Sequence, residues 1–270
     1  MNIEKTKQFE KDIIKKYRRD IWTKFIKGIK KYNMIENGDK VAIAMSGGKD
    51  SLLLAKLFQE LKKHPLVDFE IEFISMDPGF SEDNLKLHFG NAEELGIPLN
   101  IDRSDIFEIV QKISKEYPCY MCARMRRGFL YNMAKEKGCN KLALGHHFDD
   151  VIETTMMNVM YAGTFKTMLP KVKSKNFEGL ELIRPMYLIH EKDIIKLMKS
   201  NDIVTMDCGC EITVCRTSSK RYEIKQMISK FREQSNDIDK NIFRAAENVN
   251  LDSIYRWTKD GKEHTFYDDY

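Results

Sequence analysis

The residues best suited to chemistry lie in one short run, Ser46-Gly47-Gly48-Lys49-Asp50-Ser51. Apolar residues 41–45 precede this run and an apolar helical pattern follows it from Leu52, so the sequence predicts a strand, a glycine turn and a helix. Glycines let the backbone approach phosphate oxygens, and the N–H groups at a helix N-terminus attract anions. Lysine adds a positive charge and aspartate can hold Mg²⁺. The run is therefore a candidate phosphate site, with an ordinary glycine turn as the alternative. It is not a Walker A loop, which has four residues between its glycines.

A second polar run, Gly-His-His-Phe-Asp-Asp at residues 145–150, follows another apolar segment. It joins a predicted strand to a predicted helix. Either Asp149 or Asp150 could simply cap that helix, because carboxylates accept hydrogen bonds from the first N–H groups. A carboxylate at a strand end that faces the glycine turn could instead bind Mg²⁺ on ATP. The two runs together are more specific than either one alone.

The cysteines form a third group. Cys119 and Cys122 stand in a CxxC spacing directly after Pro118, at the start of a predicted helix, where the helix N-terminus lowers the pKa of a thiol. Three further cysteines could complete a metal site: Cys208, Cys210 and Cys215. Tetrahedral zinc needs four ligands in all, and the cysteine count does not separate zinc from an iron–sulfur cluster.

Basic residues gather in three places. Residues 1–31 hold eleven Lys/Arg and four Asp/Glu, a balance of +7 in a chain of net charge +4. This segment suits a polyanion such as RNA; a solvated helix, or acidic neighbours in a homodimer, are the alternatives. Residues 164–175, predicted as a loop, hold four lysines and no acid, which gives the predicted RNA-binding residues Lys166, Lys171, Lys173 and Lys175. Arg124, Arg126 and Arg127 follow the CxxC and either face solvent or bind phosphate.

Length and composition limit the class of protein. A chain of 270 residues with 42% hydrophobic residues can bury a sizeable core. No apolar run approaches the roughly 20 residues of a membrane span, and the N-terminus lacks the apolar core of a signal peptide. We therefore expect a cytoplasmic protein without a membrane partner. In that compartment cysteines are usually ligands or thiols rather than disulfides. Cys139 stands apart from the others, and we expect it to be packed.

The pattern of elements predicts an α/β fold. Expected helices cover residues 3–34, 51–63, 83–94, 105–115, 118–137, 149–161, 190–199, 220–233 and 237–248; expected strands cover 40–45, 69–76, 98–102, 141–145 and 202–206, with a strand pair after 176. Strands that alternate with helices indicate a parallel sheet with right-handed crossovers. We divide the chain into a basic N-terminal helix (1–36), a domain with the candidate phosphate site and a CxxC insertion (37–206), and a cysteine loop with C-terminal helices packed on that domain (207–270).

In this order the motifs resemble the PP-loop ATP pyrophosphatases and, among them, the tRNA-cytidine 2-sulfurtransferase family of tRNA thiolases. The matching segments are SGGKDS, PGF (78–80), CxxCxRxRRG (119–128), GHHxDD (145–150), the lysine segment and residues 184–194. The similarity extends to residues 242–249 and so covers nearly the whole chain. It implies a PP-loop fold of the adenine nucleotide alpha-hydrolase type: a parallel sheet flanked by helices, with an N-terminal helix and a C-terminal helical extension.

The resemblance also implies a reaction. ATP would adenylate C2 of a cytidine in the anticodon loop, at tRNA position 32, and sulfur carried by a 4Fe-4S cluster would replace the oxygen to give 2-thiocytidine. Mg²⁺ would accompany ATP, and a cysteine desulfurase or free sulfide would donate the sulfur. Two cluster ligands match Cys119 and Cys122. The family's third ligand opens a CxxC, which a CGC with a later cysteine replaces here, so Cys208 is the first choice and Cys210 and Cys215 are alternates.

By the same matching, the implied ATP-binding residues are Ala44, Ser46, Gly47, Gly48, Lys49, Asp50, Ser51, Met76, Arg127, Gly145 and Asp150. The implied catalytic residues are Asp50, Arg126, Asp150, Cys119 and Cys122. Related thiolases have a catalytic lysine where this sequence has Arg126. Since arginine stays protonated, Arg126 would stabilise negative charge rather than transfer a proton. Two other functions stay open: a PP-loop ligase that joins an amine to an adenylated base or carboxylate, and a non-catalytic tRNA-binding protein with a structural zinc site.

Overall fold

The structure is a computed structural model of the 270-residue chain, and it describes residues 3–113, 118–206 and 220–269. The chain divides into two compact units. The first comprises Met1–Val151 and Leu169–Ser218, and the second comprises Ile152–Met168 and Ser219–Tyr270. The first unit thus contains the basic N-terminal segment together with the glycine turn. The second combines part of one central helix with the C-terminal segment.

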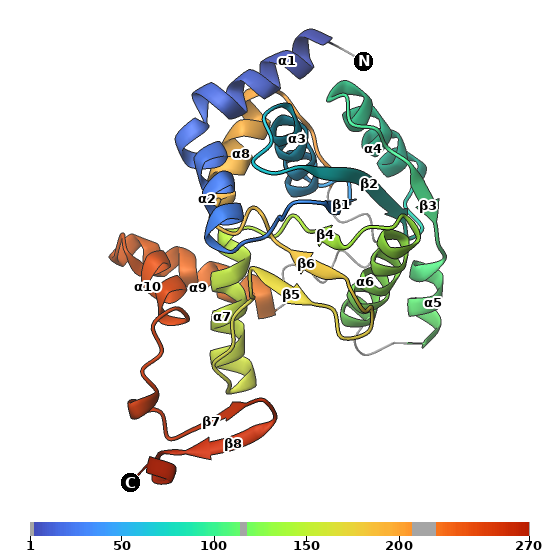
Figure 1. The fold of residues 1–270 in the computed structure, drawn as a ribbon. Helices are drawn as coiled ribbons and strands as arrows, with labels where there is room; N and C mark the ends of the chain where they lie inside the picture. Colours follow the sequence, from blue (N-terminus) through green and yellow to red (C-terminus); the bar gives the residue numbers. More distant parts are fainter. Residues whose placement is uncertain (1–2, 114–117, 207–219, 270) are drawn as a thin grey trace. The chain divides into compact units, whose positions relative to one another are not determined.

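A six-stranded sheet organises the first unit, in the order β3-β2-β1-β4-β6-β5 (Figure 1). The strands are β1 (Asp39–Met45), β2 (Phe69–Asp77), β3 (Ile101–Arg103), β4 (Lys141–Ala143), β5 (Lys171–Lys173) and β6 (Glu181–Ile183). All neighbours are parallel except β5 and β6, which are antiparallel. The predicted parallel α/β sheet is confirmed. After β1 the chain builds β2 and β3 on one side and then returns to β4 on the other, so the strand order reverses between β1 and β4.

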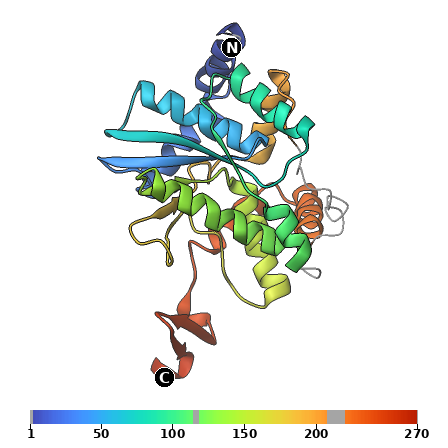
Figure 2. The same cartoon turned by 90° about the vertical axis from the view of Figure 1, so that its right-hand side faces the viewer.

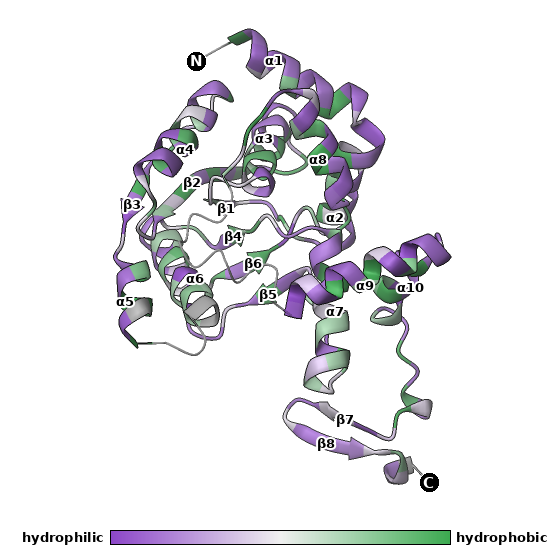
Figure 3. Ribbon diagram, turned by 180° about the vertical axis from the view of Figure 1, so that it is seen from behind, coloured by the Kyte–Doolittle hydropathy of each residue, from purple (hydrophilic) through white to green (hydrophobic). Residues whose placement is uncertain are grey.

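Helices cover both faces of this sheet (Figure 2). They are α3 (Lys49–Lys63), α4 (Glu82–Glu94), α5 (Ile106–Ile113), α6 (Pro118–Glu136) and α8 (Glu191–Ser200). Side chains along β1 alternate between the two faces of the sheet. On one face, Ala42 and Ala44 pack in a cluster with Met133 and Ala134 of α6. The flanking helices carry hydrophilic residues beside the hydrophobic ones, as amphipathic helices do (Figure 3).

The predicted N-terminal helix is present but is not a regular α-helix. It consists of α1 (Ile3–Lys11), π-helical turns over Asp12–Lys16 and Arg18–Trp22, and α2 (Thr23–Lys31). Its buried residues Phe9, Ile13, Ile21 and Phe25 belong to a repeat of four, longer than the 3.6 residues of an α-helical turn, so a regular α-helix would rotate the stripe by about 40° per repeat. The wider π turns offset this drift and keep the apolar residues on one face.

The second unit contains most of α7 (Phe148–Ala162), then α9 (Lys220–Gln234), α10 (Ile238–Ala245) and the hairpin of β7 (Arg256–Lys259) and β8 (Lys262–Thr265). The hairpin was not expected, although the sequence carries its signal. Asp260 and Gly261 form the two-residue turn with φ of 52° and 77°. Asp-Gly is a preferred pair in such turns, because both central residues need positive φ.

Two expectations in the first unit are wrong. Residues 202–206 form no strand: Asp202 has a φ of 51°, and the segment bonds to a loop and a side chain instead of a sheet edge. The lysine segment is not all loop, because Lys171–Lys173 pairs with β6 as the edge strand β5. Across residues 3–113, 118–206 and 220–269, no helix is long and apolar enough to span a membrane.

Candidate active site

A cavity of about 410 Å³ opens at the carboxyl ends of β1 and β4. Its walls come from the end of β1 and the start of α3, from β2, from the turn after β4, and from α6. The lining residues are Ala44, Met45, Ser46, Asp50, Ser51, Met76, Ala123, Arg126, Arg127, Leu130, Leu142, Leu144, Gly145, His146 and Asp150. The cavity therefore lies where the strand order reverses, which is the usual ligand site of an open α/β sheet.

The glycine turn is held by the hydroxyl of Ser51. This oxygen accepts a hydrogen bond from the Ser46 backbone N–H (3.1 Å) and donates one to the Gly48 carbonyl (2.9 Å). Gly47 has a φ of 77°, and a Cβ there would lie 2.2 Å from the Met206 sulfur. Only glycine fits at that position, both for its conformation and for space. The turn thus has the compact form that lets backbone N–H groups face phosphate oxygens.

Lys49 and Asp50 open α3 with opposite charges. The Lys49 ammonium contacts Asp50 at 3.0 Å and Glu191 at 3.2 Å. Burial alone would lower the pKa of Lys49, but the two carboxylates outweigh burial and raise that pKa. The Oδ1 atom of Asp50 is buried and accepts no hydrogen bond. Burial raises the pKa of Asp50, and nearby Asp150 acts in the same direction. Nε2 of His147 lies 3.8 Å from Oδ1 of Asp50, which is beyond hydrogen-bond distance. A buried carboxylate oxygen without a hydrogen bond is costly, and a bound Mg²⁺ would reduce that cost.

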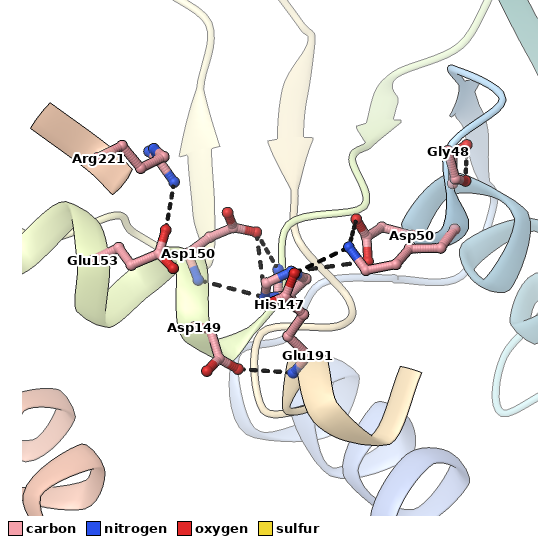
Figure 4. A network of polar contacts seen from close by, with 10 residues as sticks. Gly48, Asp50, His147, Asp149, Asp150, Glu153, Glu191 and Arg221 are labelled. Atoms are coloured by element: carbon pink, nitrogen blue, oxygen red, sulfur yellow. Dashed lines mark hydrogen bonds and ion pairs between the residues drawn. The ribbon is translucent and has the colours of Figure 1, made fainter. Parts of the chain in front are cut away.

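The residues after β4 form a reciprocal helix cap (Figure 4). Asp150 accepts a hydrogen bond from the His147 backbone N–H (3.0 Å), and the Asp150 backbone N–H donates to Nδ1 of His147 (3.4 Å). This is a capping box with histidine as the cap residue. Asp149 instead accepts from the Glu191 backbone N–H (2.7 Å) and so caps the start of α8. The expected capping of the helix after β4 therefore holds for Asp150, which also lines the cavity, whereas Asp149 caps a different helix.

Gly145 brings this turn against α3. A Cβ at Gly145 would lie 3.1 Å from the backbone carbon of Asp50 and 3.2 Å from its oxygen. Backbone atoms cannot rotate away as a side chain can. The missing side chain therefore lets the turn after β4 approach the first turn of α3 and places Asp50 and Asp150 at one cavity.

Comparison with known proteins agrees with this geometry. Residues 20–207 match the family model of the PP-loop domain. The tRNA-cytidine(32) 2-sulfurtransferase of Syntrophotalea carbinolica is 35% identical over 83% of this chain and 86% of its own length. A relative of the same name from Francisella tularensis subsp. novicida is 35% identical over 90% of this chain and 91% of its own. This chain belongs to the tRNA-cytidine(32) 2-sulfurtransferase family.

The family resemblance predicted from the motifs is thus confirmed, and so is the expectation of an enzyme. A solved structure supports the fold: the U34-tRNA thiolase NcsA from Methanococcus maripaludis with its 4Fe-4S cluster superposes with a TM-score of 0.65 at 25% identity. The alignment covers 86% of this chain and 82% of that chain.

The structure brings most of the predicted ATP-binding residues of the family to one cavity. Exceptions are Gly47, Gly48 and Lys49, which do not line it; the lysine turns to Glu191. Both Arg126 and Arg127 line it from α6. The same helix carries Cys119 and the half-buried Cys122 at its start.

The remaining predicted residues are elsewhere. Cys208, Cys210 and Cys215 lie outside the described residues. Cys139 is packed in the core at 3% exposure, and burial raises the pKa of its thiol to about 11, which is unsuitable for a metal ligand. Among the lysines, Lys171 pairs with Glu181 and Glu36, whereas Lys166, Lys173 and Lys175 are exposed.

Three residues that support the site were missed. Glu191 lies in the family-like segment 184–194 but was given no role. The buried ring of His88 contacts Ser75 at 2.9 Å and lies under Gly47. Met206 covers the glycine turn, and its backbone N–H donates to the Gly47 carbonyl (3.3 Å). Neither of the last two stands in a motif, so sequence alone offered no signal.

Proposed function

We propose that the protein catalyses ATP-dependent thiolation of cytidine 32 in tRNA, giving 2-thiocytidine. One observation carries this proposal: the helix that begins with the CxxC also forms a wall of the ATP cavity. Ala123, the residue after Cys122, lines the cavity together with Arg126. This supports a site that the cysteine ligands and the nucleotide would share, which sulfur transfer needs and which a ligase does not.

The donor set fits an iron–sulfur cluster. Cys119 and Cys122 stand one turn apart at the N-terminus of α6, where thiolates are favoured. Met206, two residues before Cys208 in the sequence, packs on the glycine turn. We propose Cys119, Cys122 and Cys208 as ligands, with Cys210 and Cys215 as alternates. Bound there, the cluster would supply the sulfur that replaces the C2 oxygen.

The residues of the chain divide the remaining work. We propose that Ser46, Ser51 and the glycine backbone hold the phosphates of ATP. Asp50 and Asp150 would hold Mg²⁺ on those phosphates. Arg126 would stabilise the negative charge that develops on the adenylated oxygen. Adenylation is needed because the C2 oxygen of cytosine is a poor leaving group, whereas AMP leaves with its charge on phosphate. A cysteine desulfurase or free sulfide would restore the sulfur.

The test measures nucleosides of total tRNA by mass spectrometry in a strain that lacks the gene. We expect selective loss of 2-thiocytidine, with recovery from the wild-type gene and none from Cys122→Ala. A control variant, Cys139→Ala, should restore the nucleoside, because this thiol is buried in the core and does not line the cavity. Loss of a thiouridine instead would overturn the choice of cytidine. Unchanged thionucleosides together with a missing amine-modified base would favour the ligase.

A further inference from the structure

Arg184 is a half-buried cation that forms no ion pair among the residues that the structure describes. It directly follows β6, and one of its terminal nitrogens donates to the Leu169 carbonyl. Its Nε atom is buried and has no hydrogen-bond partner. No carboxylate of residues 3–113, 118–206 or 220–269 forms an ion pair with it. Burying a charge in this way costs free energy unless something pairs with it.

A second unpaired guanidinium lies close by. Arg127 lines the cavity from α6 and forms no ion pair within the described part of the chain. Burial lowers the pKa of Arg184 to about 10, and the positive charge of Arg127 acts in the same direction, although Tyr131, Tyr187 and Asp150 offset part of the effect. Both guanidinium groups also act on the phenol of Tyr131, one helical turn after Arg127. Two cations therefore lie near one region, where Asp150 is the described carboxylate that acts on Arg184 without forming an ion pair with it.

Two fully buried lysines of this unit do have charged partners. Lys56 is 1% exposed and donates to Glu10 (2.7 Å) and to the Leu95 carbonyl (2.9 Å). Lys141 is 5% exposed and pairs with Glu181 and, at 3.7 Å, with Asp39. Since the fold supplies partners for these lysines, the lack of one at Arg184 indicates that an anionic ligand completes the pair.

The neighbouring elements indicate which anion this is. Phosphates of ATP already have the glycine turn and the start of α3, and Arg184 is not among the residues that line the cavity. Arg184 instead connects to the lysine segment, because its backbone N–H donates to the Pro170 carbonyl (2.9 Å) immediately before β5. Lys173 at the other end of β5 is exposed, about 13 Å along the strand from Leu169. Positive charge thus runs from the exposed edge strand towards the cavity.

We propose that Arg127 and Arg184 together bind a backbone phosphate of the tRNA where the RNA enters the active site. This inference rests on the proposed function, since it names how the substrate of that same site is held. Guanidinium groups bind phosphate through two parallel hydrogen bonds, and such contacts fix the position of the RNA without reading its sequence. Both arginines are therefore positioning residues for the target base.

The experiment compares equilibrium binding of 2-thiocytidine-free tRNA, and KM for tRNA and ATP, in the cluster-loaded enzyme. The variants are Arg127→Gln, Arg184→Gln and Arg184→Lys, with Lys112→Gln as the control. Lys112 is exposed and pairs only with Glu108 among described residues. We expect Arg127→Gln to weaken tRNA binding about tenfold and to reduce the slope of log K against log salt by about 1. Arg184→Lys keeps the positive charge but loses the two parallel N–H donors of the guanidinium group. Its affinity for tRNA should therefore lie between those of wild type and Arg184→Gln.

Two results would overturn the proposal. A rise in KM for ATP with unchanged tRNA binding would show that the arginines serve the nucleotide. Unchanged tRNA binding and unchanged salt slope in Arg127→Gln would show that no RNA phosphate is bound. Because Arg184→Gln also loses the bond to Leu169, its thermal unfolding is measured beside Arg127→Gln, which breaks no described hydrogen bond. The binding assay does not depend on turnover. If the wild-type enzyme bound tRNA but formed no 2-thiocytidine, the proposed function would be refuted, whereas the proposed phosphate contact would not.

Discussion

The two ends of α3 each carry a charged cluster, and the clusters differ in how far their charges are paired. At the first turn, Oδ1 of Asp50 is buried without a hydrogen-bond partner. Near the last turn, Lys63 contacts Glu10 at 2.7 Å and Glu60 at 2.5 Å, while Lys56 contacts Glu10 at 2.7 Å. Charged residues of similar type thus form an incomplete network at one end and a complete one at the other.

This difference indicates which cluster stabilises the fold and which is available to bind a ligand. A completed network holds the N-terminal helix on α3, because Glu10 comes from α1 and the lysines from α3. The two lysines hold the pKa of Glu10 below its ordinary value even though burial would raise it. The incomplete network keeps a cost in the folded protein that a ligand can remove. Removing charge should therefore affect activity at one end and stability at the other.

The largest effect is expected at the incomplete end. Asp50→Asn should lower 2-thiocytidine formation by about a hundredfold or more, because it removes a carboxylate that we propose holds Mg²⁺. The same variant should not be less stable than wild type. The pKa of Asp50 is raised in the folded protein, so its stabilising contribution is present below the ordinary pKa and is lost as the pH rises through the folded value. At neutral pH the ionised carboxylate is a cost that asparagine avoids.

Activity is measured with tRNA and ATP, and stability by thermal unfolding of the same samples. If the unfolding temperature fell enough to account for the loss of activity, Asp50 would be a structural residue. The contrast between the two ends of α3 would then be wrong. Asp83→Asn is the matched control: this aspartate lies in the first turn of α4 and is exposed.

The next effect is expected at the complete end. Lys56→Met should cost about 2 kcal/mol of unfolding free energy, because it leaves Glu10 with one partner fewer and the Leu95 carbonyl buried without its donor. The activity per folded molecule should stay at the wild-type level. Chemical denaturation at fixed pH gives the free energy, with the exposed Lys86→Met as control. Loss of activity without loss of stability would place this network in the active site.

The sequence predicts some regions of the molecule better than others. The glycine turn and the run after β4 were predicted as sites because each stands at the end of a buried strand, where parallel strands bring their polar ends together. The element pattern was sufficient for the sheet, since strongly apolar strands alternate with amphipathic helices. Residues that act on the site from a distance in sequence, such as His88 and Met206, could not be predicted, because only the folded chain brings them to Gly47.

Local geometry explains the other differences. The four-residue repeat from Phe9 to Phe25 predicted the helix but not its π turns, although a repeat longer than 3.6 residues contains that information. Asp260-Gly261 was overlooked because the C-terminal residues lack strong alternation. The predicted strand at 202–206 is apolar enough for one, but its groups bond elsewhere: the Val204 carbonyl accepts from Asn91, and Met206 donates to Gly47.

A smaller effect on activity is expected from Gly145→Ala. The added Cβ would meet backbone atoms of Asp50 at 3.1–3.2 Å, so the turn after β4 must move away by a few tenths of an ångström. We expect kcat/KM for ATP to fall about tenfold, because small misplacements of groups around the reacting centre are costly. Gly90→Ala is the control, since nothing lies within 4 Å of a Cβ there. Equal kinetics in the two variants would show that the close approach at Gly145 is not needed.

The smallest effect is expected at Cys139. This variant tests whether cysteines, like the charged clusters, separate into residues that stabilise the fold and residues that serve activity. The thiol is 3% exposed, and burial raises its pKa from 9.0 to about 11. Cys139→Ala should keep its iron and its activity and lose about 1 kcal/mol of stability. In wild type this cysteine stabilises the fold below the ordinary thiol pKa, and that contribution falls as the pH rises from about 9 to about 11. A denaturation series from pH 7 to 11, compared between wild type and Cys139→Ala, measures the difference. If alkylation of native protein at pH 8 modified Cys139 as fast as a free thiol, the thiol would be accessible, and its assignment to the packed core would be wrong.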